Sequence, residues 1–501
     1  MFKAIFKKEL QISITSYSLF SGFALCLFLC IASAYIRAGN YGERHESYIR
    51  ALRGSEDTLK KVKVYSMISG AIWVIRKPRP MSIFVAGLDE KVGNSMNVSH
   101  GESSGYIFQS LYSMDNPYLR IFSQIDLGMI FQIILSLFAL LFSYRMISGD
   151  KEDGCLKLIL ANGIPRWKVI MAKYTANAVI LFLLTLVGIA AGITGMISGL
   201  KYLPFWKAMD LGRGAIFILI TSLYALLFLA IGVLISTITH RASTSLIIAI
   251  FIWVVLIVAY PKLSSYLVEN ICPVEPELAT FERLSKVWQD YEKEVRGFVE
   301  RIGIGDREDL LGPIKAKGKI RGGGGSSSLW GRSEWVWIEG ISGEIDPRIM
   351  KCIEFRERLA ASYADKASWI WMEYLKRGPI RQARIALNVM RLSPAIAYYN
   401  SLAIISGTDL ESTYIWFLDE VGNYRKELMR YLEDKEAFRS PKWFTTDSGS
   451  VDLSDMPRFR DTLEPISSAL SRAIVDILIL LVLNFVFLIG SYAAFSRYDV
   501  R

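Results

Sequence analysis

Long apolar runs alternate with long charged segments along the chain. A helix needs about 20 mostly apolar residues to cross a bilayer, and six runs come close to that length. These runs are Tyr17–Ile36, Leu127–Ile147, Thr175–Ile197, Ala215–Ile235, Ser245–Tyr260 and Ile474–Ala494. The pattern predicts an α-helical polytopic membrane protein with span one at 17–37, spans two to five within 126–262 and span six at 472–496.

Residues 1–12 show a two-sided pattern just before span one. Apolar residues recur at helical spacing on one face, and lysines occupy much of the opposite face. This arrangement is typical of an amphipathic helix that lies in the membrane interface. A basic flank that only orients span one is the alternative.

Two polar segments, 38–125 and 263–471, separate the spans. The first mixes β-branched and aromatic residues with turn signals, which predicts a mixed α/β segment. The second has apolar residues at helical spacing and interleaved opposite charges, which predicts a mainly helical domain between spans five and six. Within it, the run "KGKIRGGGGSSSLWG" at 317–331 is predicted to be a flexible linker.

The chain carries a formal net charge of +10. Basic residues of membrane proteins collect at cytoplasmic borders, so this charge does not require a nucleic-acid partner. No zinc finger or basic-aromatic groove accompanies the charge, and we expect no nucleic-acid binding. The basic loop after span two outweighs the basic loop after span three, which predicts a multi-pass protein of the cell membrane with both termini in the cytoplasm and both polar segments outside.

The sequence contains no recognisable catalytic or metal-binding pattern. Only three histidines are present, and none belongs to a zinc-protease motif. No serine-hydrolase elbow occurs, and the glycine run at 322–325 lacks the lysine and hydroxyl residue of a phosphate-binding loop. We therefore expect no enzyme activity, no metal site and no cofactor in this chain.

A few polar residues interrupt the spans. Gln132, Asn177 and Asn484 lie deep in their runs, and Asp476 follows Arg472 by one helical turn near the outer border. Interhelical hydrogen bonds, together with an Arg472–Asp476 pair, are the preferred interpretation. Contact with a transported substrate is the alternative.

Five cysteines are present, and two of them share the second polar segment. Cys272 and Cys352 are candidates for a disulfide if that segment faces an oxidising compartment. Two unpaired thiols are the alternative.

Residues 148–170, between spans two and three, form a short charged segment with a leucine-rich face. Acidic residues near its start complement a helix dipole, and its leucines are suited to an apolar groove on a partner. An amphipathic loop on the membrane surface is the alternative. The candidate contact residues are Gly149, Asp150, Lys151, Glu152, Asp153, Gly154, Leu156, Leu158, Ile159 and Leu160.

The stretch "ISGDKEDGCLKLILANGIPRWKVIMAKY" resembles the coupling-helix region of type-2 ABC exporter permeases. It departs from that pattern in having Asp150 and Cys155 where the family often has glutamate and threonine. The basic amphipathic start and the six spans with cytoplasmic termini are also similar to this family. Met390–Leu410 resembles a segment ahead of the last span in permeases with a large ectodomain.

The resemblance implies the membrane subunit of an ATP-binding-cassette transporter that exports a substrate by alternating access. ATP and Mg²⁺ would then bind to a separate cytoplasmic ATPase present in two copies. A second permease chain would complete a homodimer within the lipid bilayer.

The same resemblance assigns roles within 148–170. Lys151 and Glu152 are the implied polar anchors for the ATPase. Leu156 and residues 158–160 are the implied apolar contact, and the two glycines are implied to let the backbone turn.

The polar segment before span six is expected to handle the substrate or to dock an extracytoplasmic partner. An alternative from another class is a non-transporting membrane sensor or assembly scaffold, whose ectodomain would bind a ligand or a partner.

Overall fold

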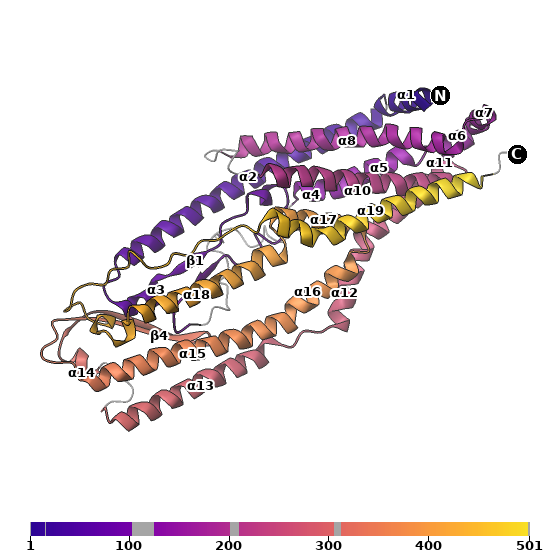
Figure 1. Cartoon of the computed structure of the whole chain (residues 1–501). Helices are drawn as coiled ribbons and strands as arrows, with labels where there is room; N and C mark the ends of the chain where they lie inside the picture. The colour runs from indigo at the N-terminus through magenta and orange to yellow at the C-terminus, as the bar shows by residue number, and fades with distance from the viewer. Residues whose placement is uncertain (1, 16, 103–124, 201–209, 305–311, 499–501) are drawn as a thin grey trace.

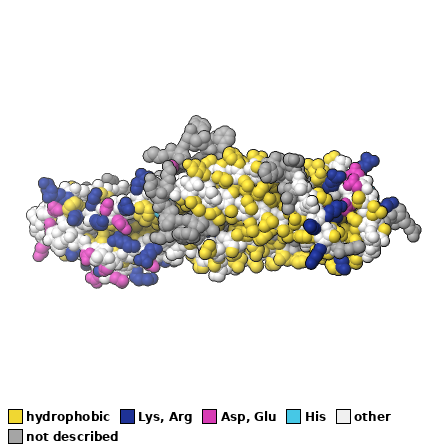
Figure 2. Space-filling model, turned by 90° about the horizontal axis from the view of Figure 1, so that it is seen from above, with side chains coloured by type: hydrophobic (Ala, Val, Ile, Leu, Met, Phe, Trp, Pro, Cys, Tyr) yellow, Lys and Arg dark blue, Asp and Glu magenta, His cyan; other side chains and the backbone are white. Residues whose placement is uncertain are grey.

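The computed structural model describes residues 2–15, 17–102, 125–200, 210–304 and 312–498. These residues form an elongated molecule, with a bundle of long apolar helices at one end and a mainly helical polar lobe at the other (Figure 1). The polar lobe comprises the described residues of 54–75, 95–102, 277–377 and 411–465. Apolar side chains cover the bundle, whereas charged side chains gather on the lobe and at the opposite tip (Figure 2).

Six helices in the described part of the chain are long and apolar enough to cross a membrane. They are Gly22–Lys60, Leu127–Glu152, Arg166–Gly199, Leu211–Ile238, Ala242–Ile271 and Ile466–Ser496. Each predicted span falls largely within one of these helices. The prediction of a polytopic helical membrane protein is therefore confirmed.

The N-terminal part of the chain forms two helices. α1 (Phe2–Ile14) packs along span three, and α2 (Tyr17–Lys60) contains span one. α2 has 44 residues, which corresponds to about 66 Å of helix, so it continues past the predicted end of span one into the lobe. The segment 38–125 is therefore helical at its start. Further on, the short strands β1 (Trp73–Ile75) and β2 (Ser95–Asn97) pair antiparallel.

The other spans differ in regularity. Span two consists of α4 (Leu127–Ile130), the π-helical turn η4 (Phe131–Leu135) and α5 (Ser136–Ser143). Span five consists of α11 (Ala242–Val254), the π-helical turn η5 (Val255–Ala259) and α12 (Tyr260–Ile271). Spans three, four and six are α8 (Arg166–Gly199), α10 (Leu211–Ile238) and α19 (Ile466–Ser496).

Glycine allows close contact between α2 and α8. A Cβ atom at Gly195 would lie 2.4 Å from the carbonyl oxygen of Ile31. A Cβ atom at Gly199 would lie 2.6 Å from the carbonyl oxygen of Tyr35. Small residues one turn apart let two membrane helices approach at backbone distance, which explains the tight α2–α8 pair.

A thirteen-residue helix, α17 (Pro394–Ser406), lies inside the bundle. It packs against α10 and α19, and Tyr398, Leu402 and Ile405 are completely buried there. The prediction placed this helix in the extracytoplasmic segment 263–471, and its burial among the spans corrects that boundary. Its length is below that of a span, so the helix enters the bundle without crossing it.

The lobe is built on three long helices, which Figure 1 shows extending away from the bundle. They are α13 (Glu277–Ile302), α15 (Pro347–Arg377) and α18 (Trp416–Asp434). The short α14 (Gly312–Lys315) precedes a β-hairpin, and α16 (Pro379–Met390) connects α15 to α17. A mainly helical domain therefore follows span five, with one hairpin against its helices.

The prediction of a flexible linker at 317–331 is wrong. Gly322–Gly325 lie in β3 (Lys319–Ser328), which pairs antiparallel with β4 (Gly331–Glu339). A Cβ atom at Gly324 would lie 2.9 Å from Nε1 of Trp335, so glycine makes room for the indole across the hairpin. The glycines serve packing in this strand rather than flexibility.

Cys272 and Cys352, the candidate disulfide pair, are both free cysteines in this structure. Cys352 is 1% exposed and packs in the lobe core from α15. Cys272 ends α12, and its carbonyl oxygen accepts a hydrogen bond from Gln382. Each cysteine therefore packs in a different local environment.

Candidate functional site

Two short helices cap the bundle at the end opposite the lobe: α6 (Ser148–Glu152) and α7 (Cys155–Ala161). α1 and the last turns of α19 lie at the same end (Figure 1). Gly154 between α6 and α7 has φ +72°, a left-handed conformation that residues with a Cβ atom rarely adopt. The helical break therefore depends on glycine at this position.

Asp150 of α6 is tied to the bundle by a buried ion pair. Its carboxylate lies 2.6 Å from Nζ of Lys173 in α8. The same ammonium lies 2.7 Å from Glu9 in α1 and donates to the carbonyl oxygen of Met146. One buried lysine therefore connects α1, α6 and α8.

Lys151 and Glu152 bind the junction between α10 and α11. The Lys151 ammonium donates to the carbonyl oxygens of Thr237 and Thr239, the latter at 3.0 Å. The Glu152 carboxylate accepts a hydrogen bond of 3.0 Å from the backbone N–H of Ala242. Both predicted ATPase anchors thus make contacts within this chain, although the Glu152 side chain stays exposed.

The predicted apolar contact residues lie on different sides of α7. Leu156 is 1% exposed and packs into the bundle, so it holds α7 in place rather than offering a surface. Leu158 is 69% exposed and points away from the bundle. Ile159 and Leu160 are half-buried at its edge. A partner therefore has access mainly to Leu158.

Gly149 does not serve as a turn, which corrects its predicted role. It lies within α6, where a Cβ atom would lie 2.4 Å from the side chain of Arg145. Arg145 in turn reaches Asp153, 3.4 Å away, on the exposed side. Gly149 therefore allows close packing of the Arg145 side chain, while Gly154 alone makes the turn.

The exposed side of these helices continues onto neighbouring elements. A cavity beside them is lined by Phe2 of α1 and by residues 162–165, 167 and 168. Trp167, at the start of α8, is 50% exposed beside it. Phe2 and Trp167 were not among the predicted site residues, although exposed aromatic residues beside a charged helix are a general signal of binding. We call Asp153, Lys157, Leu158 and Trp167, whose side chains are exposed, the α6–α7 face.

The deep polar residues form hydrogen bonds between and within helices. The Gln132 amide donates to the carbonyl oxygen of Ala395 in α17, and the Asn484 amide donates to that of Leu223 in α10. Asn177 accepts a hydrogen bond from Ser13 of α1. These contacts favour the interhelical interpretation over a substrate path.

The predicted Arg472–Asp476 pair is not present. Asp476 is completely buried and pairs with Arg391 at 2.8 Å, while Asn400 of α17 donates to it at 2.6 Å. Arg472 instead pairs with Asp409 and Glu464. Asp476 therefore joins α19 to α17 and to the end of α16.

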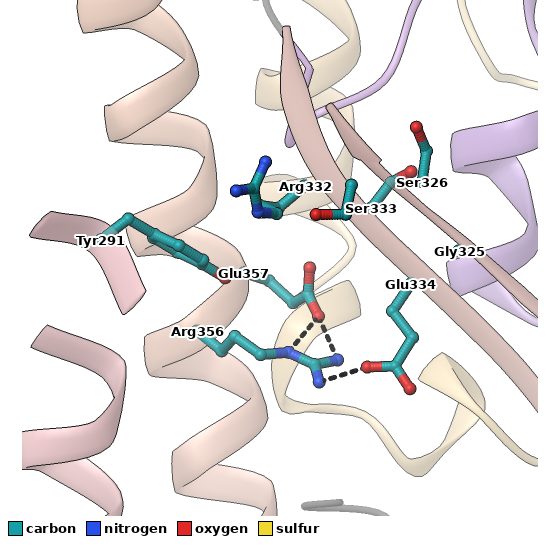
Figure 3. Close-up of a pocket in the computed structure, with 9 residues that line it drawn as sticks. Tyr291, Gly325, Ser326, Arg332, Ser333, Glu334, Arg356 and Glu357 are labelled. Atoms are coloured by element: carbon teal, nitrogen blue, oxygen red, sulfur yellow. Dashed lines mark hydrogen bonds and ion pairs between the residues drawn. The ribbon is translucent and has the colours of Figure 1, made fainter. Parts of the chain in front are cut away.

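Charged groups also meet at a cavity of about 290 Å³ in the lobe (Figure 3). Arg356 pairs there with Glu357 at 2.6 Å and with Glu334 at 2.8 Å. Behind them, His100 contacts Glu357 at 2.6 Å and Ser69 at 3.0 Å. A serine, a histidine and an acidic residue in contact in this order form the catalytic triad of many hydrolases. Ser69, however, is only 3% exposed and does not line the cavity.

The electrostatics of this cavity indicate a structural network. Burial opposes ionisation of Glu357, but Arg356 and the hydrogen bond with His100 outweigh it and lower the pKa of Glu357 to about 2. The charged groups thus satisfy one another and leave no unpaired charge for a ligand. Within the described residues, no cluster of His, Cys, Asp and Glu could hold a metal ion.

A bundle of six helices that are long and apolar enough to cross a membrane, with a pair of short helices at one tip, is the architecture of a multi-pass membrane protein. The model of a protein family described as "ABC-2 family transporter protein" matches residues 3–500. The chain therefore belongs to this family of ABC transporter permeases. The chain is also 27% identical over 131 residues to the probable ABC transporter permease protein NosY of Stutzerimonas stutzeri. That match covers 25% of this chain and 45% of the relative, so the chain spans less than half of the relative's length.

Proposed function

We propose that this chain is the membrane-spanning subunit of an ABC exporter that is driven by a separate cytoplasmic ATPase. ATP and Mg²⁺ bind to the ATPase subunits, and this chain supplies the substrate path and the coupling element. Two copies of this chain and two ATPase subunits form the transporter.

The arrangement of α6 and α7 supports this proposal most directly. Their outer side, the α6–α7 face, is exposed, and their inner side is fastened by short polar contacts. A displacement of α6 reaches α8 and α1 through Lys173, and it reaches the α10–α11 junction through Lys151 and Glu152. An element with one free face and several rigid attachments is suited to transmit movement.

These attachments suggest how ATP binding moves the spans. Closure of the ATPase subunits around ATP displaces α6 and α7 as a unit, because Leu156 packs α7 into the bundle. The polar contacts then tilt spans three, four and five together. A path between two permease chains opens alternately to either side of the membrane as these tilts change.

Binding of an ATPase at this tip also orients the chain in the cell membrane. α1, α6, α7 and the end of α19 share the tip, so both termini face the cytoplasm and the lobe faces the outside (Figure 1). The lysines of α1 are then on the cytoplasmic side, as expected from the distribution of basic residues in membrane proteins. Outside, the lobe handles the substrate or docks a partner.

A pair of matched leucine variants tests the proposal. Leu158 in the α6–α7 face is 69% exposed, and Leu278 in the lobe is 68% exposed. The variant Leu158→Glu should abolish co-purification of an ABC ATPase, identified by mass spectrometry and by Mg²⁺-dependent ATP hydrolysis. Leu278→Glu carries the same change at the same exposure and should retain the ATPase.

Other outcomes contradict the proposal. If both variants retain the ATPase equally, the α6–α7 face is not its binding site. If no ATPase accompanies the unaltered chain in mild detergent, the sensor or scaffold function is favoured instead.

A further inference from the structure

The cavity in the lobe has room for a small molecule. Its volume is about 290 Å³, and α13, α15 and the β3–β4 hairpin line it. Since one water molecule occupies about 30 Å³ in the liquid, this space corresponds to about ten water molecules or to one monosaccharide. The size of the cavity therefore suits a compact polar ligand.

The charged side chains around the cavity are paired with one another. The lining includes two arginines and two glutamates: Arg332, Arg356, Glu334 and Glu357. Arg356 pairs with both of these glutamates, and Arg332 pairs with Glu292 of α13 at 3.0 Å. A charged ligand would find no free counter-charge here, and an unpaired charge is costly to remove from water. The lining therefore favours a neutral ligand.

Three polar groups of the lining keep their capacity for hydrogen bonding. In the part of the chain that the structure describes, the hydroxyls of Tyr291 and Ser327 and the Oε1 atom of Glu334 have no hydrogen-bond partner. Figure 3 shows the Tyr291 side chain pointing from α13 towards Glu357. Ser327 and Glu334 are exposed on the hairpin, so a ligand can reach them from solvent.

These three groups match the chemistry of a ligand that is rich in hydroxyls. A hydroxyl both donates and accepts hydrogen bonds, so Tyr291 and Ser327 can serve a ligand hydroxyl in either sense. The free carboxylate oxygen of Glu334 accepts a hydrogen bond from another. Burial, together with the nearby carboxylate of Glu357, raises the pKa of Tyr291, so its hydroxyl keeps the proton that it donates.

We propose that this cavity binds a neutral sugar unit, which Tyr291, Ser327 and Glu334 hold by hydrogen bonds. The three groups come from α13, β3 and β4, and a few converging polar groups in a concave site are typical of small-molecule binding. The sugar unit is a free monosaccharide or the end of a glycan chain, which share this chemistry. Sugar binding at the lobe does not depend on the proposed export function.

Isothermal titration calorimetry on the full chain in lipid nanodiscs tests the proposal. Nanodiscs of phosphatidylethanolamine and phosphatidylglycerol are used because detergents with sugar head groups would compete for the cavity. The neutral probes are glucose, galactose and N-acetylglucosamine, and their charged counterparts are glucuronate, galacturonate and glucosamine. We expect saturable binding of at least one neutral sugar, with its charged counterpart bound at least tenfold more weakly.

The source of the sugar unit is distinguished by a trisaccharide of the monosaccharide that binds. Tighter binding of the trisaccharide assigns the cavity to the end of a glycan chain. Exclusion of the trisaccharide assigns it to a free monosaccharide.

Single-hydroxyl variants place the binding in this cavity. Tyr291→Phe and Ser327→Ala should each weaken binding about fivefold, the effect of one lost hydrogen bond. Tyr363→Phe and Ser362→Ala are the matched controls on α15 and should bind the sugar like the unaltered chain. The Tyr363 hydroxyl donates to Glu294 and does not line the cavity.

Three results would overturn the proposal. If no neutral sugar binds saturably, the cavity holds only water. Equal affinity for the charged counterparts would contradict the requirement for a neutral ligand. Unchanged binding by both Tyr291→Phe and Ser327→Ala would place the sugar elsewhere.

Photolabelling with a diazirine derivative of the sugar that binds leaves the chain unaltered and does not depend on the folding of any variant. Labelled peptides from α13 or the β3–β4 hairpin, identified by mass spectrometry, support the proposal. Labels confined to other elements contradict it. Neither outcome bears on the ATPase, so failure of this proposal leaves the proposed function standing.

Discussion

Nζ of Lys173 lies 2.6 Å from Oδ2 of Asp150, and this ammonium is also 2.7 Å from Glu9. The lysine side chain is 4% exposed, and the two carboxylates are 15% and 12% exposed. A charge in such a place is stable only when it is paired and hydrogen-bonded. The arrangement therefore makes the position of α6 dependent on α8 and on the N-terminal helix.

Replacement of Lys173 by methionine removes the charge but keeps much of the side-chain volume. Asp150 and Glu9 are then left close together without a counter-charge. Loss of one partner from a buried pair costs about 3 kcal/mol, so the thermal unfolding temperature of the purified chain in detergent should fall. Lys173→Arg keeps the charge and is the control; equal stability of both variants would show that the ion pairs contribute nothing.

The spans could be predicted because length and hydropathy determine them locally. Each apolar run approaches the thickness of a bilayer, and no other part of the chain is needed to recognise it. α17 could not be predicted in the same way. Its thirteen residues are too few for a span, and it is buried only because α10 and α19 cover it.

Several contacts of the candidate site depend on distant residues. The i,i+4 rule favours Arg472 as the partner of Asp476, but Arg391, 85 residues earlier, reaches that carboxylate instead. Periodicity places Leu156 and Leu158 on different faces of α7 without indicating which face the bundle covers. The helix of the candidate site was therefore predictable, but its exposed surface was not.

The close contact of α2 with α8 predicts opposite effects for two glycine-to-alanine substitutions. At Gly195 a Cβ atom would lie 2.4 Å from the carbonyl oxygen of Ile31, so the helices must separate. This overpacking is expected to cost about 1–3 kcal/mol. At Gly39 in α2 no heavy atom lies within 4 Å of the added Cβ, and alanine there should raise stability by about 0.5–1 kcal/mol.

Thermal unfolding in detergent measures both glycine variants under one condition. A lower melting temperature for Gly195→Ala, together with an unchanged or higher melting temperature for Gly39→Ala, supports direct backbone contact between the two helices. Equal melting temperatures would mean that α2 and α8 are further apart than the structure indicates.

The β3–β4 hairpin predicts slow hydrogen exchange in a glycine-rich segment. Amides of Lys319–Ser328 should be protected, because the strand is paired with β4 along its length. Gly324→Ala forces the Trp335 indole to move and should speed exchange about fivefold, which corresponds to a loss of about 1 kcal/mol. Gly323→Ala is the control on the same strand, since its Cβ would meet its nearest neighbour at an ordinary 3.4 Å.

Composition alone cannot distinguish this strand from a linker. The four glycines and three serines of the segment are equally typical of flexible linkers, and the deciding residue, Trp335, lies on the partner strand. Rapid exchange throughout the segment, in the unaltered chain and in both variants, would support the linker interpretation.

The buried Glu357 predicts how the stability of the lobe depends on pH. Burial opposes its ionisation, but Arg356 and His100 lower its pKa from 4.5 to about 2. A carboxyl group whose pKa is lowered by folding stabilises the folded state above its unfolded pKa. From these two pKa values, the contribution is about 3 kcal/mol at neutral pH, and it is lost as the pH falls from 4.5 towards 2.

Glu357→Gln keeps the shape of the side chain and removes this contribution. The variant should be less stable than the unaltered chain at pH 7, and the difference should shrink as the pH is lowered towards 2. Asp89 also has its pKa lowered to about 2, since Arg76 and Arg44 outweigh the effect of burial, but it is present in both proteins and cancels in the comparison.

Thermal unfolding in detergent, followed by tryptophan fluorescence over a pH series, measures this difference. The exposed Glu344→Gln should show no such pH dependence, and a constant difference for Glu357→Gln at every pH would mean that Glu357 acts through packing rather than charge.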